Sequence, residues 1–442
     1  MPGPGFKGAQ ALTELEAAAG RWLELLPDRR CDAAALARGA EYFGLGAREL
    51  NDAAERLPEL HDLGYEGVRL LLAAVVDEFA GLFSRGERPL CEVTVPAPPV
   101  LIYALQAARP DLRFCSGALY AQTVLRGLFL DRRPLENSGG SRPRCGLNRM
   151  RARLMAYPPV KPAGCLLQFG VLCSECVAAC SGLSPDTRRL DLILPEGEGF
   201  EALAERCGAY LKELESAFGL RLGPEHIRRA AGLSRRLLRA QARIEEQCAM
   251  QGAALCGNSL ALAQTVQLAA ADGAERIVAA LELMAEELGP APRAADAARL
   301  YCYYVPYLLP EVDAAFRRHG VRLTGGGAFV RRGTPPCPGL AQATAAWAEA
   351  MNIRRPAREE CEALADEVQR WGCDGYLTGS FSFDARLGPA QERQLCILTQ
   401  RYGVLAYRLG ADFWSERGAP DIEREIEDIC ASVMRDVRGR GQ

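Results

Sequence analysis

The stretch that decides the fold is Gly375-Tyr376-Leu377-Thr378, a short apolar run followed by a helical pattern at 389–402. Three more apolar runs of the same kind lie at 300–304, 321–324 and 404–407. Continuous apolar strands that alternate with helices are typical of a buried parallel sheet. Four strand–helix units in a row therefore predict an open, doubly wound sheet in this part of the chain.

A similar but less regular alternation precedes this region. Apolar runs at 91–95, 165–169 and 190–194 predict a first parallel sheet, and residues 10–85 carry the apolar spacing of amphipathic helices. The sequence thus predicts an α/β fold with two open, mostly parallel, Rossmann- or flavodoxin-like sheets in tandem behind a helical N-terminal region. The predicted parts are a helical N-terminal region (1–88), a first α/β domain with the candidate cluster site (89–215), and a helical linker plus second α/β domain (216–442).

Composition excludes several classes of protein. The chain has 442 residues, of which 49% are hydrophobic, and a formal net charge of −3, which argues against bulk electrostatic binding to nucleic acid. No run of 18 or more apolar residues is present, and the N-terminus lacks the pattern of a signal peptide. The 17 cysteines are odd in number, and a chain of this length can bury a core without disulfides. We therefore expect a cytoplasmic protein with reduced thiols and no contact with membranes or nucleic acid.

The sharpest local feature is Cys173-Ser-Glu-Cys176-Val-Ala-Ala-Cys180, just after the predicted strand 165–169. Open α/β sheets usually place their sites at the carboxyl ends of the strands. Thiolates at such spacing suit an iron–sulfur cluster or zinc, and Cys145, at the start of a helical pattern, is a further candidate ligand. The alternative is that the spacing places small thiols on one buried helix face, and from spacing alone this interpretation is favoured.

Two other features allow a functional and a structural interpretation. The glycines 325–327 after a strand could bind a phosphate through backbone N–H groups, but a tight strand-to-helix turn is the favoured interpretation. A helix from Glu225 carries a basic stripe that could meet the phosphates of a nucleotide-like ligand. Only three of the 53 basic residues are lysines, so this arginine-rich chain favours a solvated face instead. The stripe consists of Arg228, Arg235, Arg239 and Arg243.

Five segments, in the expected order, resemble the 2-hydroxyacyl-CoA dehydratase and ATP-dependent benzoyl-CoA reductase family. The segment from Cys145 to Leu154 (CGLNRMRARL) resembles the helix start that carries the family's first cluster cysteine, and Gly164 to Cys173 resembles the strand leading to the second. The other segments resemble the opening strand, proline and helix, the helical passage between domains, and the end of the second domain. These are Cys91–Ala108, Tyr210–Ala242 and the stretch from Asp374 to Trp414.

This resemblance implies a specific chemistry. Family members pair with a homologous second subunit, and each chain supplies three cysteines to a [4Fe–4S] cluster. A separate ATP-hydrolysing activator protein delivers one electron, which reduces the thioester of an acyl-CoA to a ketyl radical before dehydration or ring reduction. Carried over to this chain, the resemblance implies that Cys145 and Cys173 are cluster ligands.

The chain departs from the family pattern at the third ligand, where Phe383 occupies the place of a cysteine. Three interpretations follow. The chain is a divergent dehydratase subunit whose cluster is completed by Cys176 or Cys180; or it is a clusterless homologue that serves as a scaffold or pairing subunit; or it is an accessory protein that binds the activator or an acyl-CoA without chemistry.

Overall fold

The structure is a computed structural model. It describes residues 9–84, 88–135, 145–170, 187–193, 199–251, 255–289, 297–303, 309–327, 339–350, 357–379, 387–411 and 416–440.

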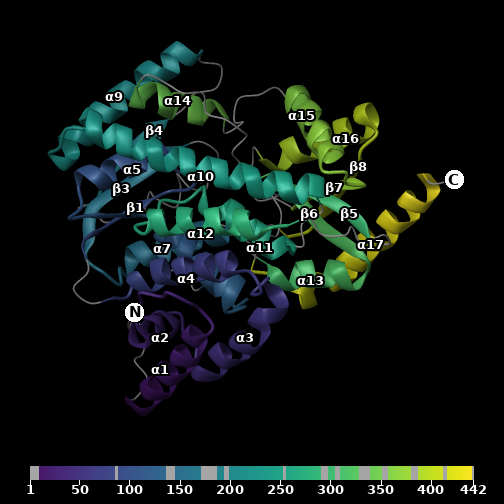
Figure 1. Ribbon diagram of the computed structural model, residues 1–442, viewed down its shortest axis with the longest axis horizontal. Coiled ribbons are helices and arrows are strands. Elements are labelled where there is room, and N and C mark those ends of the chain that lie inside the picture. Colours follow the sequence, from purple (N-terminus) through teal and green to yellow (C-terminus); the bar gives the residue numbers. More distant parts are fainter. Residues whose placement is uncertain are drawn as a thin grey trace.

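Two four-stranded parallel sheets form the centre of the molecule, which confirms the predicted α/β fold with tandem sheets (Figure 1). The first sheet has the order β2-β1-β3-β4 and the second β6-β5-β7-β8. In each sheet the first strand of that half of the chain lies between the second and the third strand. The strand order, and not the strand direction, therefore reverses beside the first strand of each sheet. A crevice at the carboxyl ends of the strands at such a reversal is the usual place for a site in open α/β sheets. The strands are β1 Leu90–Val93, β2 Arg113–Cys115, β3 Pro162–Gly170, β4 Arg188–Ile193, β5 Ala298–Tyr303, β6 Val321–Gly327, β7 Gly375–Gly379 and β8 Leu405–Leu409.

Helices surround both sheets, and those at the N-terminus form a separate layer, seen in purple in Figure 1. The predicted helices at 310–319, 389–402 and 419–435 are confirmed as α13, α16 and α17. The helices are α1 Ala9–Glu24, α2 Ala33–Tyr42, α3 Ala47–Leu60, α4 Glu66–Gly81, α5 Pro99–Ala108, α6 Gly117–Gln122, the π-helix η1 Thr123–Leu128, α7 Gly146–Ala156, α9 Phe200–Phe218, α10 Pro224–Gln251, α11 Gly257–Val266, α12 Ala274–Glu287, α13 Pro310–Arg318, α14 Leu340–Ala350, α15 Ala357–Arg370, α16 Leu387–Tyr402 and α17 Ala419–Arg440.

The glycines 325–327 do not form the tight turn that the sequence favoured. They continue β6, and their backbones pair with Tyr301, Cys302 and Tyr303 of β5. Glycine is uncommon inside strands because it has no side chain to pack, and this is why the sequence reads as a turn. The backbone groups of these glycines therefore pair with β5 inside the sheet, and the predicted turn at 325–327 is wrong.

The N-terminal helices are fixed to the helix that precedes the second sheet. The carboxylate of Glu287, at the end of α12, accepts hydrogen bonds from the backbone N–H groups of Glu66 (2.9 Å) and Gly67 (2.7 Å) at the start of α4. The first turn of a helix has N–H groups without intrahelical partners, and a carboxylate there also interacts favourably with the helix dipole. Gly67 is needed for this contact, because a Cβ atom there would lie 2.5 Å from Cα of Met284.

We expect Gly67→Ala to lower the free energy of unfolding by about 3 kcal/mol, because the new methyl group forces α4 and α12 apart. Gly232→Ala is the matched control, since a Cβ atom at this position of α10 meets nothing within 4 Å. The control is expected to gain about 0.5–1 kcal/mol from the higher helix propensity of alanine. Urea unfolding of both variants checks this prediction, and equal stabilities would show that the α4–α12 contact is loosely packed.

Candidate functional site

Cys145 lies at the edge of the first sheet where a site is expected. It is the N-cap residue of α7, 5% exposed, and a short connection leads from α7 into β3. A helix that feeds a parallel strand in this way runs antiparallel to it, so the start of α7 lies near the carboxyl end of β3. Strand β3 ends at Gly170, three residues before Cys173. The other predicted ligands, Cys173, Cys176 and Cys180, lie outside the described residues, as does Phe383.

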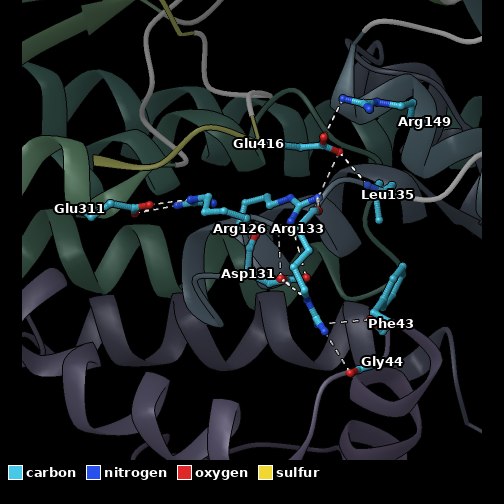
Figure 2. Close-up of polar contacts among 10 residues, drawn as sticks. Phe43, Gly44, Arg126, Asp131, Arg133, Leu135, Arg149, Glu311 and Glu416 are labelled. Atoms are coloured by element: carbon cyan, nitrogen blue, oxygen red, sulfur yellow. Dashed lines mark hydrogen bonds and ion pairs between the residues drawn. The ribbon is translucent and has the colours of Figure 1, made fainter. Parts of the chain in front are cut away.

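The helix that begins at Cys145 also contacts the second half of the chain. Arg149, one turn further along α7, donates a hydrogen bond of 2.8 Å to Oε2 of Glu416, which lies between β8 and α17 (Figure 2). The other oxygen of this carboxylate, Oε1, accepts from the backbone N–H of Leu135 (3.1 Å) and from Nη2 of Arg126 (3.2 Å). Glu416 follows the carboxyl end of β8, so this contact joins the carboxyl edges of the two sheets.

A second ion pair joins the same two edges. Arg132 binds Glu311 through two parallel hydrogen bonds of 2.5 and 2.6 Å, and both side chains are largely buried. Glu311 lies in the first turn of α13, which follows β5. A bidentate pair between a guanidinium and a carboxylate fixes orientation as well as distance. Glu311 and Glu416 thus anchor one short segment of the first half against the second (Figure 2).

Arg126 is the buried centre of this arrangement. Its side chain is fully buried on the π-helix η1, and its guanidinium donates to the carbonyl oxygens of Asp131 and of Arg133. Burial lowers the pKa of Arg126 to about 10, while Asp131 and Glu416 oppose that shift. The group remains protonated at neutral pH, so its positive charge is balanced by carboxylates inside the protein. We name Arg126, Arg132, Arg149, Glu311 and Glu416 the interdomain charge network.

A narrow pocket opens beside the carboxyl end of β1, where the strand order of the first sheet reverses. Thr94 ties the ends of two strands together, because its hydroxyl oxygen accepts from the N–H of Phe169 (2.9 Å) and its own N–H donates to Leu167 (2.9 Å). Trp347 of α14 packs against Phe169 with ring centres 6.1 Å apart. The pocket has a cavity volume of about 20 Å³, roughly the room that one water molecule needs. Its lining comes from the loop that leads into α5 and from α10 and α14.

Sequence reasoning identified Cys145 but missed the charge network and the pocket. One signal was available for Arg126, since it is the lone charged residue in the apolar run 114–130. A charge inside such a run has to be buried with a partner. No comparable signal marks Glu416, which is 290 residues away in the sequence.

No protein-family model matches this chain, and no curated protein sequence matches it either. None of the helices in the described part of the chain has the length and apolar character that crossing a membrane requires.

Proposed function

We propose that the chain is a subunit of the 2-hydroxyacyl-CoA dehydratase type, which dehydrates or reduces an acyl-CoA with the help of a [4Fe–4S] cluster. The observation that carries the proposal is the position of Cys145. It caps a helix at the carboxyl edge of the first sheet, and the same helix contacts the carboxyl edge of the second sheet through Arg149 and Glu416. A thiol between two such edges lies where open α/β sheets bind ligands.

The donor set fits a cluster on chemical grounds. Cys145 and Cys173 would hold it, completed by Cys176 or Cys180, because thiolates are the ligands that iron–sulfur clusters take. Among the described residues alone, no group of three or more potential metal ligands is found. The proposed site therefore depends on Cys145 together with the segment after β3. When bound, a cluster with one position free of protein ligands supplies an electron and a Lewis acid for the thioester oxygen.

The interdomain charge network would hold this site in place. Arg149 and Arg126 both bind Glu416, and Arg132 binds Glu311, so each of these arginines has a carboxylate partner within the chain. These arginines would therefore act as positioning residues. They fix the start of α7, and with it Cys145, relative to the second sheet.

The proposal includes partners and a compartment. A homologous second subunit, an ATP-hydrolysing activator protein and an acyl-CoA are the partners that the family resemblance implies. We propose the cytoplasm as the compartment, because the odd number of 17 cysteines in a chain of this length favours reduced thiols.

The second candidate is a clusterless homologue that pairs with a catalytic chain. Phe383 favours it, because phenylalanine cannot bind iron at the place of the third family cysteine. An accessory protein that binds the activator or an acyl-CoA without chemistry is the third possibility.

Iron and acid-labile sulfide per chain, measured after anaerobic purification and reconstitution, test the proposal. About four of each per chain is the expected result for a [4Fe–4S] cluster. A folded protein without iron would contradict the catalytic function and favour the clusterless homologue. Affinity purification would then distinguish a pairing subunit, which retains a homologous chain, from an accessory protein, which retains the activator alone.

A further inference from the structure

Helix α10 carries three arginines of the predicted basic stripe at intervals of four residues, so their side chains are neighbours on one face of the helix. All three are exposed, and across the ranges that the structure describes no carboxylate forms an ion pair with any of them. Like charges at this spacing repel each other and weaken the helix. These residues therefore suit a negatively charged partner. We name Arg235, Arg239 and Arg243 the basic row.

Two other arginines of the same helix differ from the basic row. Arg229 pairs with Glu275 of α12 at 3.0 Å, and Arg236 pairs with Glu282 of α12 at 2.6 Å. The arginines beside α12 thus have carboxylate partners within the chain, whereas those of the basic row extend into solvent. An arginine-rich composition does not by itself produce this difference.

Helix α15 carries the opposite charge on its exposed face. Three carboxylates are spaced there by three and four residues, and all are exposed. The nearest arginine after them, Arg370, is engaged with Glu367 at 2.6 Å. The first of the three lies in the first turn, where the helix dipole favours a carboxylate, but the other two lie beyond that turn. We name Glu359, Glu362 and Asp366 the acidic row.

The two rows belong to helices that pack on different parts of the chain. Helix α10 packs mainly on α5 and α12, whereas α15 packs mainly on α16 beside the second sheet (Figure 1). Both rows stay exposed in this arrangement. A contact between them therefore requires a second copy of the chain.

The spacings of the two rows match when the helices are antiparallel. At a rise of about 1.5 Å per residue, members of the basic row lie about 6 Å apart, and those of the acidic row about 4.5 and 6 Å apart. Parallel helices would place Arg243 against Arg370, which carries the same charge. Antiparallel helices avoid this clash and form three ion pairs, namely Arg235 with Asp366, Arg239 with Glu362, and Arg243 with Glu359.

We infer that the basic row of α10 and the acidic row of α15 form a docking surface for a second copy of this chain. Each copy carries both rows, so the contact forms twice in a dimer with twofold symmetry, the commonest closed assembly. Exposed ion pairs are individually weak and are screened by salt, so the dimer is weak and most stable at low ionic strength. The inference goes beyond the proposed function, whose partner is a homologous chain and not an identical one.

Sedimentation velocity of the purified full-length chain tests the surface, with no other subunit present. We expect an equilibrium of monomer and dimer at about 50 mM salt and a dissociation constant at least about tenfold higher at about 500 mM. Arg235→Glu/Arg239→Glu and Glu362→Arg/Asp366→Arg should each weaken the dimer at least about tenfold, because like charges then face each other. Mixed in equal amounts, these two variants should associate within about threefold of the original, because each reversed row then meets its opposite.

The matched control is Arg424→Glu/Arg438→Glu, which makes the same change in net charge at exposed positions of α17. It is expected to dimerise within about twofold of the original. A monomer at both salt concentrations, or a dimer that neither salt nor the variants weaken, would reject the surface. Equal weakening in the control and the arginine variant would mean that association follows net charge alone. Two variants that stay folded by circular dichroism but do not associate when mixed would show that the rows do not meet.

Discussion

Cys145→Ala is expected to abolish the broad absorbance at about 400 nm of the anaerobically reconstituted protein and to reduce its iron to a background level. The thiol that would bind iron is held at the N-cap of α7, between the carboxyl edges of the two sheets. An alanine there leaves the helix and its contact with Glu416 intact, since that contact is made by the side chain of Arg149. The variant should therefore remain folded while it loses the cluster.

Cys248→Ala is the matched control for this experiment. Cys248 lies on α10, and its side chain is as buried as that of Cys145, at 4% against 5% exposed. It is expected to keep both iron and absorbance, although truncation of this buried side chain lowers the free energy of unfolding by about 1 kcal/mol. Full retention of iron in the Cys145 variant would end its assignment as a ligand. Loss of iron in both variants would show that the assay reports damage to the fold.

Arg126→Met is expected to lower the free energy of unfolding by about 3–5 kcal/mol, because the substitution removes one partner of a buried ion pair. Oε1 of Glu416 and the carbonyl oxygens of Asp131 and Arg133 each lose a donor. Methionine fills part of the space but cannot donate a hydrogen bond. The two buried carbonyl oxygens then lack this donor, and the Glu416 carboxylate keeps only Arg149 and the N–H of Leu135, which together oppose folding.

The control is Arg235→Met, the same exchange at an exposed position of α10. It should change stability by less than about 0.5 kcal/mol. Urea unfolding followed by circular dichroism and by tryptophan fluorescence measures both variants. If Arg126→Met were as stable as the control, the interdomain charge network would not be what holds the two halves together. Separate transitions by the two probes would show that the halves unfold independently.

The strand–helix alternation was visible in the sequence because the central strands are continuous apolar runs. β7 is buried along its whole length, and β3 and β5 begin within three residues of the predicted runs. β2 escaped prediction because it is three residues long and begins with Arg113, whose guanidinium donates to the carbonyl oxygen of Gly81 and forms an ion pair with Asp272. Tertiary contact overrides local composition in such short segments.

The glycines 325–327 were misread for a different reason. Their local composition favours a turn, but β6 is an edge strand, and pairing with β5 holds these residues extended. Backbone hydrogen bonds to a neighbouring strand form with any side chain, so they can hold glycines in an extended strand although their composition favours a turn. Sequence patterns report side chains and not the partner strand.

The candidate site was only half accessible from the sequence. Cys145 could be found because a cysteine at the start of a helical pattern is a local signal. The residues that hold it in place come from both halves of the chain, and Arg126 and Glu416 are 290 residues apart in the sequence. An ion pair between residues so far apart produces no periodic pattern that could be recognised in a single sequence.

The carboxylate of Glu287 at the start of α4 has a consequence for the synthesis of the protein. The backbone N–H groups of Glu66 and Gly67 can form these hydrogen bonds only after Glu287 has been synthesised, 221 and 220 residues further along the chain. At about 5–20 residues per second, the ribosome needs roughly 10–45 s to reach that partner. During this interval, the face of α4 that packs on α12 is uncovered. The N-terminal helices thus emerge first but are completed late, and this face is the one that a chaperone would meet on the nascent chain.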